Sequence, residues 1–534
     1  MSLSTGASEG VVDVLVVGTG LGSLGAILAL VEADVIPTVI DVGRGLPADL
    51  EAVRERMAAA PPDCWAASDV TLLARNETAG RTGVPRKLVL GSDHFYANDE
   101  GAPPHSFALG GFSAGWGGAF LPAREEDLEG WPVSADVLLS HARRAVQSLP
   151  LSEPVDALSA WFPPLRATPG PVIGLSAGQR VLLDRVRDAA ARAEFERAGA
   201  GQSRLLTSVA QGDTPGGDEC RRCGYCMSGC VYGSILSAGD VIRRMASEGR
   251  IFLQLGSRVV RFEERADHVE VVTVDTTSGE SEIIRCKRLL LGAGAVESAR
   301  IVVRSLTPRT RSFELLRTAG AVLPLATLRR IPSDWPETNT QSSIFLEILD
   351  PEVSPHWVHT QISPANELVL RKLQLHRHGR DAPRARLRWA GFERLAYALV
   401  NLHSDHGSRY VMTLEDGAWS GSVRTEVVYP EDRRRRVRRA AAAVRGVLRG
   451  AGLHAIRPLE RDSADGIGYH LGGSLPMRTE PVRPTETDAA GRPYGSERVH
   501  VVDASVLPSL PGTTIGLLIL ANAHRIARAV TDSG

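Results

Sequence analysis

The chain has 534 residues, too many for one ordinary hydrophobic core, so length alone favours roughly two to four domains. Hydrophobic residues make up 43% and charged residues 23%, values typical of a soluble globular protein. The net charge of −1 excludes a bulk attraction to nucleic acid or to a membrane surface. No apolar run approaches the roughly 20 residues of a membrane span, and no basic segment precedes the first apolar stretch. We therefore expect a cytoplasmic protein.

The first forty residues carry the pattern of a dinucleotide-binding βαβ unit. The apolar run 11–17 predicts a buried parallel strand, residues 24–33 a helix, and 38–40 a second strand that ends on Asp41. Glycines after the first strand allow a tight turn and close approach of a pyrophosphate, and the acid suits ribose hydroxyls. The turn contains Gly18, Gly20, Gly22 and Ser23. Ser23 replaces the third glycine of the usual pattern and is small enough for close packing of helix on strand.

A second glycine-rich segment covers residues 106–118. So dense a run of glycine disfavours a stable helix or strand. A flexible surface loop would explain it, but apolar Leu109, Phe112 and Trp116 lie between the glycines. We therefore favour a backbone that lies against a large flat ligand.

Four of the six cysteines form one cluster, made of Cys220, Cys223, Cys226 and Cys230. Their C-x2-C-x2-C-x3-C spacing matches the bacterial ferredoxin pattern for iron–sulfur ligation, with Val231 in place of the following proline. In two-cluster ferredoxins the fourth cysteine serves the other cluster, so Cys230 is the weakest of the four candidates. We favour a [4Fe–4S] or [3Fe–4S] cluster; a four-thiolate zinc site and a loop of free thiols remain the alternatives.

Later segments divide between two patterns. Strands over 251–255, 259–263, 268–275, 281–286 and 288–291, with a helix from Val296, are predicted to return to the nucleotide domain. Residues 306–430 lack the βαβ rhythm, and the runs 343–349, 357–362 and 410–414 predict an antiparallel sheet. Further helices are predicted over 134–149, with Ser134 as N-cap, over 177–194 and over 433–449. We interpret the dense arginines of 433–449 as a solvated helix face rather than a nucleic-acid arm.

The C-terminal region combines a histidine with a further ligand-binding pattern. His470 precedes Gly472-Gly473, and a predicted strand over 499–502 ends on Asp503. A long apolar helix over 515–530 follows Thr513-Thr514, and its N-terminus offers donors to an anionic or polar ligand.

In this order, these elements resemble the glucose–methanol–choline (GMC) oxidoreductases, a family of FAD-dependent alcohol dehydrogenases and oxidases. The resemblance rests on the βαβ unit, the 110–118 loop, the Gly-Ala-Gly-Ala segment at 292–295, the His470 block and the 503–505 strand end. Trp116-Gly117-Gly118 and Gly130-Trp131-Pro132 resemble the branch of sugar and gluconate dehydrogenases. Some members of that branch carry an iron–sulfur cluster near the flavin in a cysteine-rich insert.

The resemblance implies an α/β fold (α+β overall), with a Rossmann-like FAD-binding domain of GMC type and an antiparallel-sheet substrate domain. The FAD-binding domain would comprise residues 1–160, 219–305 with the cysteine cluster, and 461–534 with the catalytic histidine. Residues 161–218 would form a connector and helical segment, and 306–460 the substrate domain.

It also implies roles for individual residues. The cofactor-binding set would be Gly18, Gly20, Gly22 and Ser23 at the pyrophosphate, Asp41 at the adenosine ribose, Val259 at the adenine, Gly110, Gly111, Ser113, Trp116, Gly117 and Gly118 along the isoalloxazine, and Gly292, Asp503 and Ala504 near the pyrophosphate and ribityl chain. His470 matches the catalytic histidine. Thr514 stands where the family usually has His or Asn; a hydroxyl can orient a substrate hydroxyl but is a poor base near pH 7.

The chemistry of the residues agrees with this function. A neutral imidazole suits removal of a hydroxyl proton, while a flavin takes the hydride. We expect an FAD-dependent dehydrogenase that oxidises an alcohol of a sugar-like, aminosugar or polyol substrate, similar to flavin dehydrogenases of antibiotic pathways. Electrons would leave through the cluster to a partner protein or quinone. The alternatives are a GMC oxidase without a cluster, a non-catalytic electron-transfer or redox-sensing flavoprotein, and a NAD-binding protein, which would leave the C-terminal block unexplained.

Overall fold

The fold is that of a computed structural model, which describes residues 10–73, 103–209, 219–226, 229–307, 311–335, 337–366, 369, 389–415, 423–462 and 470–532. The start of the His470 block, Gly468 and Tyr469, lies outside these residues. The first sheet has seven strands in the order β4-β2-β1-β7-β6-β5, with β18 paired to β7. The strands are β1 (Val12–Val17), β2 (Thr38–Asp41), β4 (Phe252–Leu255), β5 (Ser257–Glu264), β6 (Val269–Asp275), β7 (Ser281–Leu291) and β18 (Val499–Val501).

This sheet brings three distant parts of the chain together. β1, β2, β4, β7 and β18 are parallel, whereas β5, β6 and β7 form an antiparallel meander. The strands predicted over 281–286 and 288–291 are one continuous strand, because Lys287 between them keeps the extended conformation. The three sequence regions therefore converge on one parallel edge, where a nucleotide site is expected.

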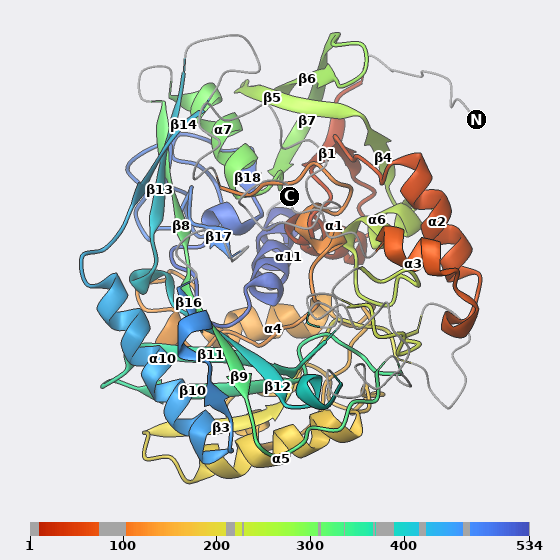
Figure 1. Ribbon diagram of the computed structural model, residues 1–534. Helices are drawn as coiled ribbons and strands as arrows, with labels where there is room; N and C mark the ends of the chain where they lie inside the picture. Colours follow the sequence, from red (N-terminus) through yellow and green to blue (C-terminus); the bar gives the residue numbers. More distant parts are fainter. Residues whose placement is uncertain are drawn as a thin grey trace.

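Helices cover this sheet on both faces. They are α1 (Leu21–Glu32), α4 (Ala135–Ala145), α6 (Ala238–Ser247), α7 (Ala295–Leu306) and α11 (Gly516–Asp532). α11 runs through the middle of the molecule and packs on α1 and α4 (Figure 1). A Cβ atom at Gly25 of α1 would lie 2.2 Å from the Leu520 carbonyl oxygen, so only glycine allows this approach. The side chain of Ser134 caps α4, as predicted.

The second sheet is antiparallel and has the order β15-β9-β12-β11-β10-β3, with β16 on β9. Its strands are β3 (Arg197–Gln202), β9 (Ala319–Ala326), β10 (Ile344–Asp350), β11 (Ser354–Pro364), β12 (Leu395–Leu402), β15 (His454–Ala455) and β16 (Arg461–Asp462). Helices α5 (Ala177–Ala191) and α10 (Arg433–Gly450) cover its outer face (Figure 1). α5 and β3 belong to the segment expected to be a connector.

Helix α10 explains the arginine run. Its apolar side packs on the second sheet, and most of its arginines are exposed or partly exposed, as predicted. Arg433 is the exception: it is 4% exposed and donates to the Asp462 carboxylate at 2.6 Å. The run therefore forms a solvated helix face with one buried anchor.

A third, four-stranded sheet has the order β14-β13-β8-β17. It consists of β8 (Ser312–Arg317), β13 (Arg409–Leu414), β14 (Val423–Val428) and β17 (Leu471–Gly472). β17 follows His470 directly, and the His470 carbonyl accepts a hydrogen bond from the Thr318 amide at 3.4 Å. Backbone pairing thus joins the C-terminal block to the region predicted to bind substrate.

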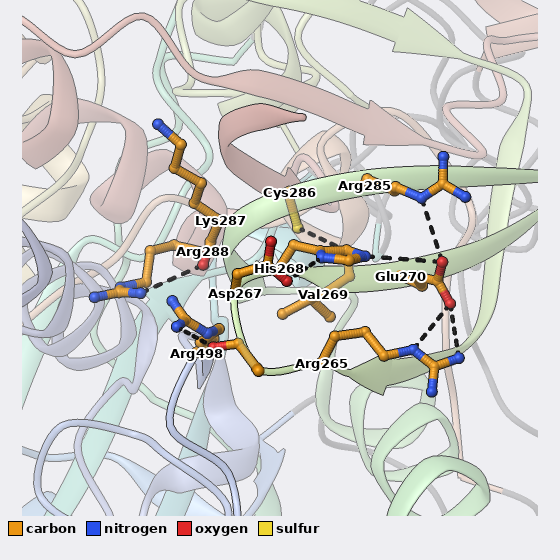
Figure 2. Close-up of polar contacts among 11 residues, drawn as sticks. Arg265, Asp267, His268, Val269, Glu270, Arg285, Cys286, Lys287, Arg288 and Arg498 are labelled. Atoms are coloured by element: carbon orange, nitrogen blue, oxygen red, sulfur yellow. Dashed lines mark hydrogen bonds and ion pairs between the residues drawn. The ribbon is translucent and has the colours of Figure 1, made fainter. Parts of the chain in front are cut away.

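The meander β5–β7 ends in a surface network that Figure 2 shows. Arg265 and Arg285 both point to the Glu270 carboxylate, with N–O distances of 2.9 and 3.3 Å. Beneath them Cys286 is fully buried, and burial raises the pKa of its thiol to about 12. This cysteine is therefore an unreactive core residue, separate from the cysteine cluster.

The remaining helices α2 (Ala48–Ala58) and α3 (Ala67–Leu73) lie near the cysteine segment. Within the described ranges, every helix is too short or too polar to cross a lipid bilayer.

Candidate active site

The turn between β1 and α1 packs closely against the ends of the neighbouring strands β7 and β18. Gly18 has φ +97°, and a Cβ atom there would lie 2.3 Å from the Gly292 carbonyl oxygen. A Cβ atom at Gly22 would lie 2.4 Å from the Val502 carbonyl. The Ser23 hydroxyl is 3.2 Å from both the Val17 and the Gly292 carbonyl oxygens. Serine at this position therefore ties β1 to β7, which explains the departure from the glycine pattern.

Gly20 behaves differently from its neighbours. A Cβ atom there would meet nothing within 4 Å, and no side chain caps the N-terminus of α1. The first amides of α1 therefore face open space, which suits an anionic group such as a pyrophosphate.

Asp41 lies at the end of β2, where a ribose is expected. Its carboxylate accepts hydrogen bonds from the Thr19 hydroxyl and, at 3.2 Å, from the Gly43 amide. Burial raises its pKa to about 6, although these hydrogen bonds act in the opposite direction. The Thr19 oxygen also accepts from the Gly110 amide at 2.9 Å, so the turn and the glycine-rich loop are joined. The ribose contact of Asp41 stays a prediction.

The 106–118 loop contains only a short 3₁₀ turn over Gly111–Ala114, in agreement with the expected lack of helix and strand. Ser113 accepts a hydrogen bond from the Ala238 amide at 2.9 Å. The Trp116 indole N–H donates to the Leu236 carbonyl at 2.6 Å. Both contacts hold the loop on the start of α6, and a Cβ atom at Gly117 would meet nothing within 4 Å. The loop is therefore a fixed surface with free space beside it.

Asp503 is a structural acid. It is 5% exposed, and its carboxylate accepts from the Gly294 amide at 2.7 Å, the Ser505 amide at 2.8 Å and the Ser298 hydroxyl. Burial raises its pKa, and these donors oppose the rise. Its side chain ties the end of β18 to the start of α7, so a ligand contact from this position would come from backbone atoms. Ala504 follows in the 3₁₀ turn 504–506.

His470 and Thr514 are the candidate site residues from the C-terminal region of the chain. Burial, with a smaller effect of His359, lowers the pKa of His470 to about 4, so its imidazole is neutral at pH 7. The Thr514 oxygen accepts from the Leu121 amide at 3.1 Å, and its O–H remains able to donate. The neighbouring Thr513 hydroxyl is fully buried and has no hydrogen-bond partner among the described residues.

Three of the four clustered cysteines, Cys220, Cys223 and Cys226, contact the segment 338–340. The Asn339 amide nitrogen lies 3.5 Å from the Cys220 sulfur, and the Thr340 backbone N–H donates to the Cys226 sulfur at 3.3 Å. Such N–H···S bonds tune iron–sulfur clusters. In the described part of the chain, no three cysteine sulfurs lie within 4.8 Å of one another, so the compact tetrahedron of a zinc site is not preformed. The iron–sulfur cluster stays a prediction.

Comparisons with known proteins point to one family. A family model for the C-terminal part of the GMC oxidoreductases matches residues 416–523. The C-terminal part of the chain is therefore similar to the GMC oxidoreductases. A relative, the 6'''-hydroxyparomomycin C oxidase of Streptomyces lividus, is 26% identical over 333 residues. That match covers 59% of this chain and 58% of the relative, less than two thirds of its length.

The fold class is confirmed by similarity to a solved structure. Pyridoxine 4-oxidase from Mesorbium loti superposes with a TM-score of 0.58 at 18% identity, covering 97% of this chain and 99% of that one. GMC oxidoreductases bind FAD, and the open N-terminus of α1, the space beside Gly20 and Gly117, and the unpaired Thr513 hydroxyl fit such a ligand. The individual cofactor contacts, including that of Val259 in β5, stay predictions.

Gln341 is a polar residue that the sequence did not reveal. Its Nε2 donates to the Gly117 carbonyl at 2.6 Å, and its Oε1 accepts from Asn339 at 2.7 Å. Since Asn339 also contacts Cys220, one hydrogen-bond path joins the cysteine segment to the glycine-rich loop. A small pocket lies beside Asn339 and Gln341, but neither His470 nor Thr514 lines it. Nothing local in the sequence signals this contact between residues 224 positions apart.

A buried acid–histidine pair was also missed. Glu347 of β10 and His359 of β11 are both 0% exposed, and the Glu347 Oε1 and His359 Nδ1 atoms are 2.6 Å apart. The register places them directly opposite each other. A reader of the sequence could have found the pair only by knowing that register.

A third group, His356, His403 and Asp405, brings three possible metal-ligating atoms within 4.8 Å of one another. The two rings stack at 3.7 Å with an angle of 22°, so their in-plane lone pairs run side by side rather than converge. Asp405 already pairs with both rings, at 3.0 and 3.2 Å. We interpret this group as a structural cluster held by Asp405, in which His403 Nε2 is buried without a partner among the described residues.

Proposed function

We propose that this protein oxidises an alcohol group of a sugar-like, aminosugar or polyol substrate to a carbonyl, with FAD as hydride acceptor. The observation that carries the proposal is the imidazole of His470, which is neutral at pH 7 and partly buried and which β17 places next to the 3₁₀ turn 504–506 that precedes α11. The name of the Streptomyces relative, a hydroxyparomomycin oxidase, favours an aminosugar alcohol among these substrates.

FAD would lie with its pyrophosphate at the N-terminus of α1 near Gly20, its ribose near Asp41 and its ring along the 110–118 loop. Bound there, it supplies the acceptor for the hydride that leaves the alcohol carbon. Support for this placement comes from the open amides of α1 and from the free space beside Gly20 and Gly117.

The chain's own groups would handle the hydroxyl. His470, neutral above about pH 4, accepts the proton of the substrate hydroxyl. Thr514 uses an oxygen lone pair on the Leu121 amide and can donate its O–H to the substrate oxygen, which orients it. Because His470 has a low pKa, it is a weak proton acceptor in the absence of further help.

The route of the electrons after hydride transfer has two candidates. The cysteine segment, with Cys220, Cys223, Cys226 and Cys230 as ligands, would hold an iron–sulfur cluster and pass electrons to a protein or quinone. The hydrogen-bond path through Asn339 and Gln341 to the Gly117 carbonyl supports this route. The word oxidase in both relatives' names favours molecular oxygen as the alternative acceptor.

Anaerobic spectroscopy tests the function. We expect purified protein to show flavin bands that bleach with at least one aminosugar or polyol alcohol, and iron and sulfide analysis to decide between the two electron routes. The His470→Asn variant should bind flavin but bleach at least ~100-fold more slowly, the scale of lost acid–base catalysis. His454→Asn, at an exposed position on β15, is the control. Unchanged bleaching in His470→Asn would remove His470 from the chemistry.

A further inference from the structure

The Glu347–His359 pair lies on the inner face of the second sheet. Residues of even number in β10 and β11, such as Leu346 and Val358, pack in the core under α5 and α10. Phe345 and Trp357, which alternate with them, pack instead against Leu121, just beyond the glycine-rich loop. Glu347 and His359 lie two residues from Phe345 and Trp357 on the same strands, so their side chains point to the same face, towards the FAD-binding part of the molecule.

The head of α11 rests on the same face. A Cβ atom at Gly512 would lie 2.8 Å from the Trp357 carbonyl oxygen and 3.0 Å from that of Asn401. His359 pairs with Asn401 in the sheet and is two residues from Trp357. The turn that carries Thr514 therefore sits beside His359, in the region where the substrate oxygen is expected.

His470 lies at the same end of this sheet. Its carbonyl accepts from the Thr318 amide directly before β9, and Gly320 of β9 pairs with Asn401 of β12, which in turn pairs with His359. His359 is also the second cause, after burial, of the lowered pKa of His470. Two other charged groups interact electrostatically with Glu347. Arg204 favours its ionised carboxylate, and the second group is the buried Asp127. Burial itself raises the pKa of Glu347.

Hydrogen bonds fix the tautomer of His359. The Ser342 hydroxyl donates to Gln361 Oε1, so the Gln361 amide N–H₂ points to His359 Nε2 at 3.2 Å. Nε2 is then the unprotonated nitrogen, and Nδ1–H donates to Glu347. A carboxylate at Nδ1 stabilises the imidazolium that forms when Nε2 takes a proton. In the described residues, no carboxylate bears on His470 in the same way.

A fully buried acid–histidine pair contributes little to the stability of a protein, because the cost of desolvating both groups offsets much of the attraction between them. The Glu347 Oε2 atom even lacks a partner among the described residues. We propose that Glu347 and His359 form the proton acceptor of the reaction centre: the proton that His470 withdraws from the substrate hydroxyl comes to rest on Nε2 of His359.

This inference rests on the proposed function and completes its proton balance. The substrate O–H bond breaks, its electron pair forms the carbonyl π bond, and the C–H pair leaves as hydride to FAD. The N–H bond formed on His470 breaks again as the Nε2–H bond of His359 forms, with loss of the Gln361 hydrogen bond. His359 thereby supplies the second imidazole that position 514 lacks, and Glu347 is its positioning residue.

The first test is anaerobic stopped-flow flavin reduction from pH 5 to 9 in holoenzyme variants. We expect Glu347→Gln to retain flavin, to reduce it more than 10-fold more slowly at pH 7, and to move the acid limb of the profile to lower pH, because a neutral amide no longer stabilises the imidazolium. His359→Asn should slow reduction further and abolish that limb. His454→Asn should behave as the unmodified protein. Unchanged rates and profiles in both variants overturn the inference, while failure of every alcohol to bleach the unmodified protein overturns the proposed function instead.

A second test does not depend on turnover or on the folding of a variant. In holoprotein with ¹⁵N-labelled histidine, we expect the signal assigned to His359 to show a protonated Nδ1 and an unprotonated Nε2. A protonated Nε2 throughout the pH range would overturn the inference, whatever substrate the enzyme proves to use.

Discussion

The adenine end of the proposed FAD site and the end around His470 differ in how the chain satisfies their polar groups. At the first end, Ser23, Asp41 and Asp503 all have hydrogen-bond partners within the protein. At the second, Thr513 Oγ1 and Glu347 Oε2 are buried without partners among the described residues. The polar groups of the first end are therefore satisfied by the protein itself, whereas those of the second end remain available to hydrogen-bond a ligand. Substitutions should accordingly reduce stability at the first end and activity at the second.

The largest effect is expected at Gly18. A Cβ atom there clashes with the Gly292 carbonyl and would occupy a positive φ, so Gly18→Ala should destabilise the protein by ~3 kcal/mol or more and yield little folded holoprotein. Gly20→Ala is the matched control, since a Cβ atom at Gly20 meets nothing within 4 Å. It should fold normally and lose FAD affinity only. Thermal unfolding and flavin absorbance check both, and equal behaviour of the two variants would contradict the comparison.

The cysteine segment packs on α2, α3 and residues 338–340, apart from both ends, and loss of one proposed ligand there should leave the fold intact. Cys220→Ser should abolish bound iron and sulfide while flavin content and the unfolding temperature change little. Cys286→Ala should retain iron, because that thiol is buried in the first sheet. Iron retention in Cys220→Ser, together with iron in the unmodified protein, would exclude Cys220 as a ligand.

Lowering the pH should reduce the free energy of unfolding, because His470 at the second end is harder to protonate in the folded state. Its folded-state pKa of about 4 lies below the ordinary 6.5, so the unfolded chain binds more protons between these values and stability falls as the pH drops through this window. The contribution of His470 to unfolding free energy should fall by about 2 kcal/mol from pH 7 to pH 5. Urea unfolding of the apoprotein at both pH values measures this. In His470→Asn the loss should be smaller by a similar amount, and an identical loss would show that His470 is exposed to solvent.

Ser23→Ala probes the first end more gently. It removes the hydroxyl that contacts the carbonyls of Val17 and Gly292, and we expect a loss of about 1 kcal/mol in unfolding free energy. Ser23→Gly, which restores the common motif, should cost about as much. Increased stability in either variant would contradict the structural role of this serine.

The smallest effect, of opposite sign, is expected at Thr513. Replacing its unpaired hydroxyl by a methyl group in Thr513→Val removes an unsatisfied buried polar atom and should stabilise the apoprotein by up to ~1 kcal/mol. Holoprotein should lose flavin more readily if that hydroxyl contacts the cofactor. Urea unfolding with and without FAD separates the two effects.

Much of the first domain follows from local sequence. Apolar runs, glycines and a terminal acid predicted β1, α1 and β2 to within a few residues, because each signal lies within one element or one turn. The strands β10, β11 and β13 were found in the same way. The cysteine motif was visible because its candidate ligands are close together in the sequence.

What the sequence did not show depends on long-range register. Glu347 and His359 meet only because β10 and β11 pair with that offset, and a shift of one residue would turn both side chains to the opposite face. Gln341 reaches Gly117 through tertiary packing alone. The expected antiparallel sheet became two sheets because β8 pairs with β13 and β17, and not with a strand of the second sheet.

That pairing has a consequence for how substrate reaches the flavin. β17, which follows His470, is hydrogen-bonded in register to β8, and β8 in turn to β13. A hinge that swung the second sheet away from the nucleotide-binding sheet would have to break the hydrogen bond between the Thr318 amide, directly before β9, and the His470 carbonyl. It would also withdraw Gly512 from the carbonyls on which it rests. We therefore expect substrate to enter and product to leave through local rearrangement of connecting segments. The nucleotide-binding sheet and the second sheet should keep their relative position throughout turnover.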